Sequence, residues 1–505
     1  MNTRKFSIRL LMFAMLTGAL ACTNLEENLV GDITREQAEG LFDATALLQA
    51  AYDELQLPFQ DQARFWAAQQ HTTDETIGPT RGPDWDDNGI WRVLHNHTWD
   101  AEHDFLTFTF NDLLGIFFTA NEVLSFNPTP EQAAEARFLR AFAVFCVADG
   151  WGQVPFREAK ENLLEAPRVL QADEALAYVL DELNEIMEDL PDAPVHKANK
   201  DAARTLLMKA HLNKGTFADR QNPSFPAEDM QRVISLADEI INSGKYTLAE
   251  NYFDNFSRNN ASMSTELIWT NENQGGNRGG NVRSRWMSTL HYNQNPSGWN
   301  GFCTIAEVYD LFEEGDERLT AEYPGVTDVS GIRPGFLIGQ QFNQDGEPLQ
   351  DRTGSALSFT KDVKLREDGN NLEVTGVRVI KYPPDYINEE PANNDYVFFR
   401  YADVLLMKAE AEARSGNMGV ATNLVNEIRE KRGANPLGSV TLDNILDERA
   451  RELYWEGHRR QDLIRFGKFL DAWTEKPASG PERLLFPIPS RALAVNPNLV
   501  QNPGY

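Results

Sequence analysis

The sequence predicts a mainly α-helical fold, in which one helical unit is interrupted by an irregular, partly β insert. Residues 138–148 are apolar on almost all sides, which is typical of a central, buried helix. Residues 400–433 predict a helical hairpin, with Gly416 and Gly433 where its two helices should end. Residues 245–399 are rich in Asn, Gly, Pro and Ser, which indicates surface loops.

Further helices are predicted where apolar positions recur at helical spacing and are followed by polar residues, Gly or Pro. They are expected at about residues 43–55, 111–124, 172–190, 202–217, 228–243 and 445–469. In the insert, only short pieces such as "LEVTGVRVIKY" have the pattern of strands. We therefore expect a helical scaffold at about 38–244 and 400–470, around a loop-rich insert at about 245–399.

The N-terminus predicts export. Basic residues precede an apolar run at 10–21 that is too short to span a bilayer comfortably, and small Ala21 precedes Cys22. This is how a lipoprotein signal looks, so residues 1–21 are expected to be removed and Cys22 to be lipidated. The alternative is an ordinary secretory signal in which Cys22 is incidental.

The charge of the chain excludes one class of partner. Its formal net charge is −29, from 47 basic and 76 acidic side chains, and no basic cluster is present. Such a surface repels phosphate backbones, so we expect no nucleic acid partner. Cys146 and Cys303 are the cysteines that remain after Cys22, and nothing in the sequence indicates that they pair.

Four blocks of the sequence carry a resemblance to a known family. They are "EARFLRAFAVF…WGQVPF", "FRYADVLLMKAEA", "ERARELYWEGHRRQDLIRFGKF" and the ending "LFPIPSRALAVNPNLVQNPGY". In this order and spacing they resemble the SusD/RagB family of Bacteroidetes outer-membrane lipoproteins. The resemblance implies a single SusD-like domain over residues 22–505, with a scaffold of tetratricopeptide-like helical hairpins.

The resemblance also implies a function. Members of the family bind oligosaccharides at the cell surface and act as a lid on a TonB-dependent transporter that resembles SusC. It therefore implies a surface-exposed lipoprotein of the outer membrane, with a glycan and such a transporter as partners in polysaccharide utilisation. The glycan itself stays open, with a β-fructan as one expectation and β-glucans as another.

The stretch "RGPDWDDNGIWRVLHNHTW", residues 81–99, allows three kinds of site. Asp84, Asp86 and Asn88 match the opening of a calcium loop, but His95 holds the place of its bidentate Glu. A metal site of His95 with His97 and His103 lacks the spacing of a third close ligand, so these histidines are expected to form structural hydrogen bonds. We therefore expect no metal or cofactor, with calcium as the minor alternative.

The third kind of site is a platform for sugars, which stack on aromatic rings and hydrogen-bond to charged and amide groups. One cluster of suitable side chains comprises Arg81, Asp84, Trp85, Asp86 and Asn88. A second, in the insert, comprises Trp286, Tyr292 and Trp299, close to Cys303, with His291 and Asn293 among them. Trp91 and Trp99 lie among apolar neighbours and are expected in the core.

The predicted function is capture of an oligosaccharide without reaction. No nucleophile elbow, phosphate loop or zinc-protease motif occurs, so no catalytic residue is assigned. Adjacent acidic residues are expected often by chance in a chain with 76 acidic residues out of 505, so such pairs alone do not indicate a catalytic site. The alternatives are a polysaccharide-processing enzyme such as a glycosidase, and a structural transporter subunit without a ligand site of its own.

Overall fold

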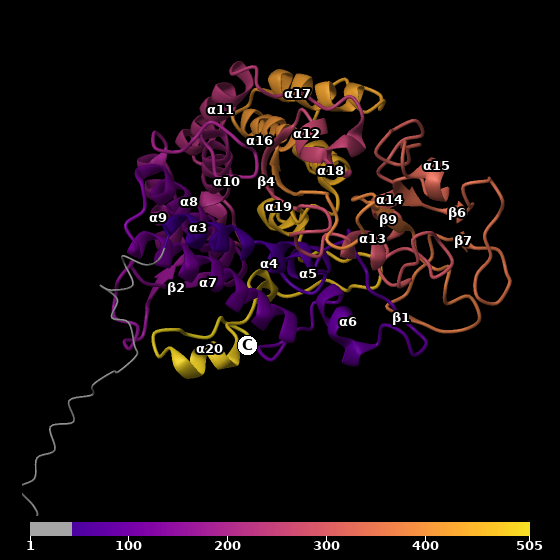
Figure 1. The fold of residues 1–505 in the computed structure, drawn as a ribbon, viewed down its shortest axis with the longest axis horizontal. Coiled ribbons are helices and arrows are strands. Elements are labelled where there is room, and N and C mark those ends of the chain that lie inside the picture. The colour runs from indigo at the N-terminus through magenta and orange to yellow at the C-terminus, as the bar shows by residue number, and fades with distance from the viewer. Residues whose placement is uncertain (1–42) are drawn as a thin grey trace, which may run out of the picture. The chain divides into compact units, whose positions relative to one another are not determined.

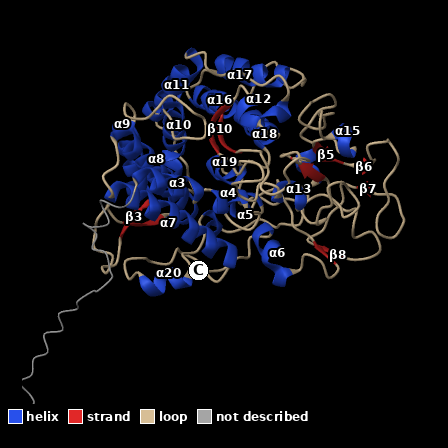
Figure 2. Ribbon diagram, in the orientation of Figure 1, coloured by secondary structure: helices blue, strands red, loops and turns tan. Residues whose placement is uncertain are grey.

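The structure, a computed structural model, describes residues 43–505. The predicted signal peptide and Cys22 lie outside the described residues. Helices form most of the part before residue 245 (Figures 1 and 2). They are α3 (Ala44–Asp53), α4 (Gln56–Gln60), α5 (Phe65–Gln70), α6 (Ile90–His95), α7 (Asp104–Ser125), α8 (Pro130–Trp151), α9 (Ala172–Ile186), α10 (Lys200–Ala218) and α11 (Ala227–Asn242).

The helical scaffold continues after the insert. Its later helices are α16 (Tyr401–Arg414), α17 (Met418–Lys431), α18 (Leu442–Leu453), α19 (Arg459–Arg465) and α20 (Ser490–Val495). Each of the helices α7 to α10 packs against the next, α11 packs directly against α16, and α16 packs against α17. This confirms the helical hairpin expected at 400–433 and the mainly helical fold with an insertion.

The insert contains short helices and strands joined by long loops. The helices are α12 (Asn260–Met263), α13 (Ser284–Met287), α14 (Ala306–Tyr309) and α15 (Thr327–Ser330). The strands are β4 (Leu267–Asn271), β5 (Gly335–Leu337), β6 (Gly339–Gln340), β7 (Ser358–Phe359), β8 (Arg366–Glu367), β9 (Arg378–Ile380) and β10 (Tyr396–Arg400). β9 lies in the stretch "LEVTGVRVIKY" that the sequence marked as strand-like.

The strands form two-stranded sheets, and one of these sheets connects the insert to an earlier part of the chain. The pairs β4–β10, β5–β9 and β6–β7 are antiparallel, as are β2 (Gln153–Phe156) and β3 (Arg168–Gln171). The strand β1 (Thr80–Arg81) pairs in parallel with β8, with Thr80 opposite Arg366. In Figure 1, β1 and α6 accordingly lie on the same side as the insert.

The central helix α8 shows why its residues form a helix. Thr129 and Gln132 make a reciprocal capping box at its start, and Gly152 ends it with a left-handed φ of 73°. Almost every side chain from its second turn onward is buried. The buried Arg140 donates to Glu182 at 3.0 Å, so this guanidinium has a carboxylate partner in the core.

The prediction of a single helix over residues 445–469 is wrong in one respect. The structure breaks it into α18 and α19, because Trp455 and Gly457 adopt left-handed φ angles of 61° and 84°. The reversal turns the intervening Glu456 into the core, where its carboxylate accepts a hydrogen bond from Arg400 Nε at 2.8 Å. A tertiary contact therefore overrides the local helical pattern.

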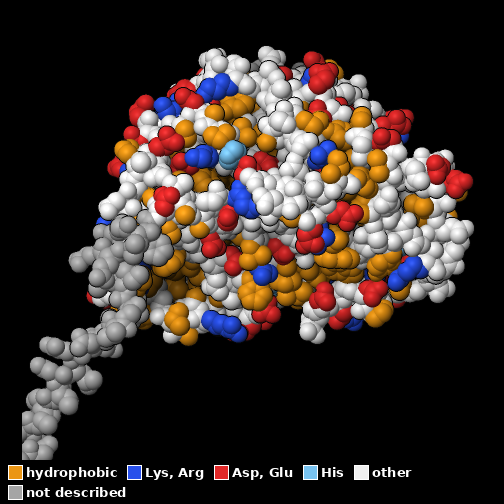
Figure 3. Space-filling model, viewed as in Figure 1, with side chains coloured by type: hydrophobic (Ala, Val, Ile, Leu, Met, Phe, Trp, Pro, Cys, Tyr) orange, Lys and Arg blue, Asp and Glu red, His pale blue; other side chains and the backbone are white. Residues whose placement is uncertain are grey.

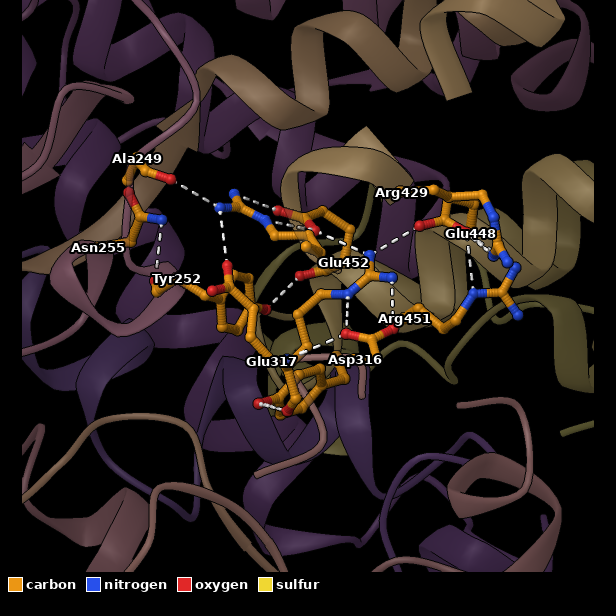
Figure 4. A network of polar contacts seen from close by, with 12 residues as sticks. Ala249, Tyr252, Asn255, Asp316, Glu317, Arg429, Glu448, Arg451 and Glu452 are labelled. Carbon is orange, nitrogen blue, oxygen red and sulfur yellow. Dashed lines mark hydrogen bonds and ion pairs between the residues drawn. The ribbon is translucent and has the colours of Figure 1, made fainter. Parts of the chain in front are cut away.

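A buried ionic cluster joins the insert to the scaffold (Figure 4). Glu452 of α18 accepts from Arg318 of the insert at 3.0 Å, from Arg400 at 2.7 Å and from Arg432 at 3.0 Å. All four side chains are almost fully buried. Removal of one partner would leave an uncompensated charge in the core, so the cluster holds the two parts of the chain together.

Among residues 43–505, no helix combines the length and the hydrophobicity that crossing a membrane requires.

Candidate functional site

The loop from Gly82 to Gly89 follows β1 and has an uncommon backbone conformation. Trp85, Asn88 and Gly89 have φ angles of 60°, 54° and 82°, all in the left-handed region. Gly and Asn adopt this region readily, but a tryptophan there costs about 1 kcal/mol. The surrounding structure therefore holds Trp85 against its own backbone preference, which is common at ligand sites.

The two predicted aromatic clusters meet at Trp85 and Trp299. The indole N–H of Trp85 donates to the backbone carbonyl of Trp299 at 2.9 Å, across 214 residues of sequence. The ring centroids lie 6.3 Å apart, with the planes tilted by 50°. Trp299 is 40% exposed and Trp85 is half-buried, so both rings offer apolar surface. The two segments therefore meet at these two rings.

Gly301 allows Trp85 to lie flat against the backbone of the insert. A Cβ at position 301 would come within 2.3 Å of two atoms of the Trp85 ring. The ring of Phe302 packs against the Trp85 ring, with the two centroids 4.8 Å apart. The position of Trp85 therefore depends on the absence of a side chain at residue 301.

Polar groups stand next to the rings. The hydroxyl of Tyr292 donates to Asp84 Oδ2 at 3.3 Å, and Arg352 Nη2 lies 3.8 Å from the same oxygen. The guanidinium of Arg352 lies 4.0 Å above the Tyr292 ring. We use the name platform for the surface formed by Asp84, Trp85, Tyr292, Trp299 and Arg352.

Glu373 and His291 fix one side of the platform. Glu373 accepts from the side chain of Arg352 and, at 3.1 Å, from its backbone N–H. His291 Nδ1 accepts from the Asn293 N–H at 3.0 Å, so Nε2 carries the proton and donates to Glu373 at 2.8 Å. Burial lowers the pKa of His291, which keeps this ring neutral. Burial raises the pKa of Glu373, but its bonds from His291 and Arg352 outweigh this and lower it.

Three of the predicted ligand contacts are corrected, because they are buried beneath the platform. Arg81 is 3% exposed and donates to the carbonyls of Leu372 at 2.7 Å and Thr375 at 2.9 Å. Burial lowers its pKa. Trp286 is 2% exposed and Cys303 is fully buried. These three side chains present no surface to a ligand and support the loops that do.

Asp86 and Asn88 lie in the same loop as Trp85. Asp86 Oδ1 accepts from Arg92 at 2.6 Å and from Arg366 at 3.4 Å. The bond from Arg92 lowers the pKa of Asp86. Within residues 43–505, no cluster of three His, Cys, Asp or Glu side chains could hold a metal ion.

The histidines of the stretch form structural hydrogen bonds, as the sequence indicated. His95 contacts the carbonyls of Thr76 at 3.1 Å and Thr474 at 2.9 Å. His97 contacts the Thr72 carbonyl at 2.8 Å. Trp91 and Trp99 are 4% and 2% exposed, which confirms that they belong to the core.

Sequence reasoning did not identify Arg352 and Glu373. Both belong to the loop-rich residues 350–375, which contain no tryptophan, tyrosine or recognisable motif. The pairing of β1 with β8 brings this segment beside the loop at 82–89. No signal in the sequence announces that pairing, because a two-residue parallel pair has no pattern of its own.

The fold and the site together define a class: a mainly helical protein in which the loop at 82–89 and a loop-rich insert together present an aromatic and polar surface platform. The SusD family model matches residues 265–481. The chain is 27% identical over 433 residues to the starch-binding protein SusD of Bacteroides thetaiotaomicron, covering 77% of this chain and 75% of that protein. It is 25% identical over 509 residues to SusD-like protein P38 of Formosa agariphila, covering 92% and 91%.

Solved structures share the fold. A SusD superfamily protein from Parabacteroides distasonis matches with a TM-score of 0.72 at 18% identity, covering 94% of this chain and 100% of that one. Surface glycan-binding protein A from Bacteroides thetaiotaomicron, in complex with laminarihexaose, matches with a TM-score of 0.63 at 20% identity, covering 91% and 98%. The chain is thus similar in sequence to SusD-like proteins and shares the fold of SusD superfamily structures.

Proposed function

We propose that the protein captures an oligosaccharide on the platform and does not cleave it. The observation that supports this most directly is the contact of Trp85 with Trp299, which brings two accessible indoles from distant segments together beside Asp84 and Arg352. The names of two similar proteins point the same way, since one is a starch-binding protein and the other was solved with laminarihexaose.

The chemistry of the platform suits a sugar chain. The apolar face of a pyranose or furanose ring stacks on an indole, while the hydroxyls at the ring edge donate to carboxylates and accept from guanidinium groups. An open surface leaves much of such a ligand hydrated, so the affinity should be modest and release fast. These properties agree with capture followed by transfer.

The wider role is part of the same proposal. Lipidation of Cys22 would anchor the chain in the outer membrane with the platform facing outward, and a SusC-like TonB-dependent transporter would receive the glycan. The relatives named above point to starch and to laminarin, a β-glucan, as classes to test first. The β-fructan expected from the sequence has no support from these relatives and stays a prediction.

Titration calorimetry tests the proposal. Starch, laminarin, fructan, xylan and mannan oligosaccharides are titrated into the protein and into the variants Trp85→Ala and Trp299→Ala. We expect binding to one class, at least tenfold weaker in both variants, and no new reducing ends during incubation. Phe118→Ala is the matched control, because Phe118 is 48% exposed on α7 and outside the platform.

Three results would contradict the proposal. Glycan binding that survives both tryptophan substitutions would place the ligand elsewhere on the molecule. New reducing ends that depend on the protein would favour the glycosidase alternative. If none of the glycans binds, the result would favour the alternative of a structural transporter subunit without a ligand site of its own.

A further inference from the structure

The charges next to the platform are not balanced at its surface. The cations are either buried or already paired: Arg352 with Glu373, and Arg92 and Arg366 with Asp86. Arg81 and Arg378 lie underneath, 3% and 0% exposed, and donate to backbone carbonyls. The side chains of Arg352 and Arg366 are 51% and 70% exposed, but an anion from solution must compete with Glu373 and Asp86 for them.

Negative charge, in contrast, is accessible. The side chain of Asp84 is 47% exposed, and its nearest cationic atom, Arg352 Nη2, is 3.8 Å away, beyond a good hydrogen bond. Asp87 is exposed and receives one bond, from the Trp91 indole at 2.9 Å. Asp84 keeps free acceptor positions beside Tyr292, and Asp87 adds an exposed carboxylate three residues further along the same loop.

The rest of the molecule adds to the negative electrostatic potential around the platform. The net charge of the chain is −29, and acidic side chains are spread over the face shown in Figure 3 instead of being gathered at one place. No compensating basic region faces the viewer in that picture. An anionic polymer would therefore meet repulsion on approach as well as at the platform.

From this arrangement we propose that the platform selects uncharged glycans and rejects chains that contain uronate or sulfate groups. Neutral hydroxyls donate to the free oxygens of Asp84 and Asp87, which gives charge-assisted hydrogen bonds. A uronate or sulfate placed there would face a like charge and find no unpaired cation. The inference rests on the proposed function and names the ligand class of the same site.

The test compares a glycan with its own acidic derivative. Laminarin and maltohexaose are titrated before and after oxidation of their primary alcohols to carboxylates, so the backbone stays the same and only the charge changes. Polygalacturonate, alginate and a sulfated galactan are titrated beside them. For the glucan that binds in its neutral form, we expect at least tenfold weaker binding of the oxidised form at 50 mM NaCl, and a smaller difference at 500 mM, where charges are screened.

A variant assigns the effect to the platform. Asp84→Asn should weaken neutral binding by about threefold, through loss of a charge-assisted bond, and should reduce the discrimination against the oxidised form to less than threefold. Glu188→Gln is the control, because it removes an exposed carboxylate, 93% accessible, that lies outside the platform. It should leave the ratio unchanged.

The outcomes separate this inference from the function on which it rests. Equal or tighter binding of an acidic glycan, lost in Trp85→Ala, would overturn the selectivity and leave glycan capture intact. Discrimination that persists in Asp84→Asn would also overturn it. If neither neutral nor acidic glycans bind, the proposed function fails and the selectivity fails with it.

Discussion

At the scale of single residues, Gly301 decides where Trp85 lies. A methyl group on Gly301 would occupy the space of the Trp85 ring, 2.3 Å from its Cε2 and Cζ2 atoms. Because atoms cannot approach so closely, the indole must move away from the backbone. We predict that Gly301→Ala weakens glycan binding at least tenfold, which is about 1.4 kcal/mol, and shifts the tryptophan emission to longer wavelength.

Gly419→Ala is the matched control for this prediction. It adds the same methyl group within α17, where no heavy atom lies within 4 Å of the new Cβ. It should leave binding unchanged and stabilise the helix by up to about 1 kcal/mol. Unaltered binding and emission in Gly301→Ala would show that Trp85 does not depend on this close approach.

Residue-level prediction from sequence succeeded where the neighbours of a side chain decide its environment. Trp91 and Trp99, among apolar residues, are buried, while Trp85 and Trp299, among polar residues and glycines, keep accessible surface. It failed for Arg81, whose guanidinium bonds carbonyls 291 and 294 residues further along the chain. Such partners become visible only once the chain is folded.

At the scale of elements, periodicity predicted the long helices well and the turn between α18 and α19 poorly. The apolar positions of residues 445–469 keep a helical spacing, and Gly457 is the local residue that marks the break. The break places Glu456 against Arg400 and Lys381, which come from other elements. The energy of these buried ion pairs, and not the preference of the segment, determines its conformation.

The ionic cluster gives a prediction for α18. Glu452→Gln removes the charge that faces Arg318, Arg400 and Arg432 and should lower the free energy of unfolding by about 3 kcal/mol. Urea denaturation at pH 7 measures this difference. Glu188→Gln, at an exposed position, should change it by less than about 0.5 kcal/mol.

The stability that Glu452 contributes depends on pH. Burial raises the pKa of Glu452, but Arg432, Arg400 and Arg318 outweigh it and hold the pKa well below 4.5. Because the folded pKa is depressed, the stabilisation is complete above the ordinary pKa and is lost as the pH falls through the folded value. The difference in unfolding free energy between the unsubstituted protein and Glu452→Gln should therefore become smaller below about pH 4. A constant gap would show that Glu452 acts through packing alone.

At the scale of the whole molecule, the scaffold and insert behave as one body in the structure. Residues 43–505 form one compact unit, and Glu452 joins Arg318 of the insert to the scaffold. We predict a single endothermic transition in calorimetry, with equal calorimetric and van't Hoff enthalpies. Glu452→Gln should move that transition to lower temperature without dividing it. Two separate transitions would show that the insert unfolds independently.

The hydrogen bond between Trp85 and Trp299 depends on the side chain of only one of the two residues. Trp85 uses its side-chain N–H, whereas Trp299 supplies only a backbone carbonyl. Any amino acid at position 299 retains that carbonyl, so the side chain there can vary without loss of the hydrogen bond that joins the two loops. Position 85 has no such freedom. In descendants of this gene, ligand preference can therefore diversify at position 299 while position 85 keeps the architecture of the binding face.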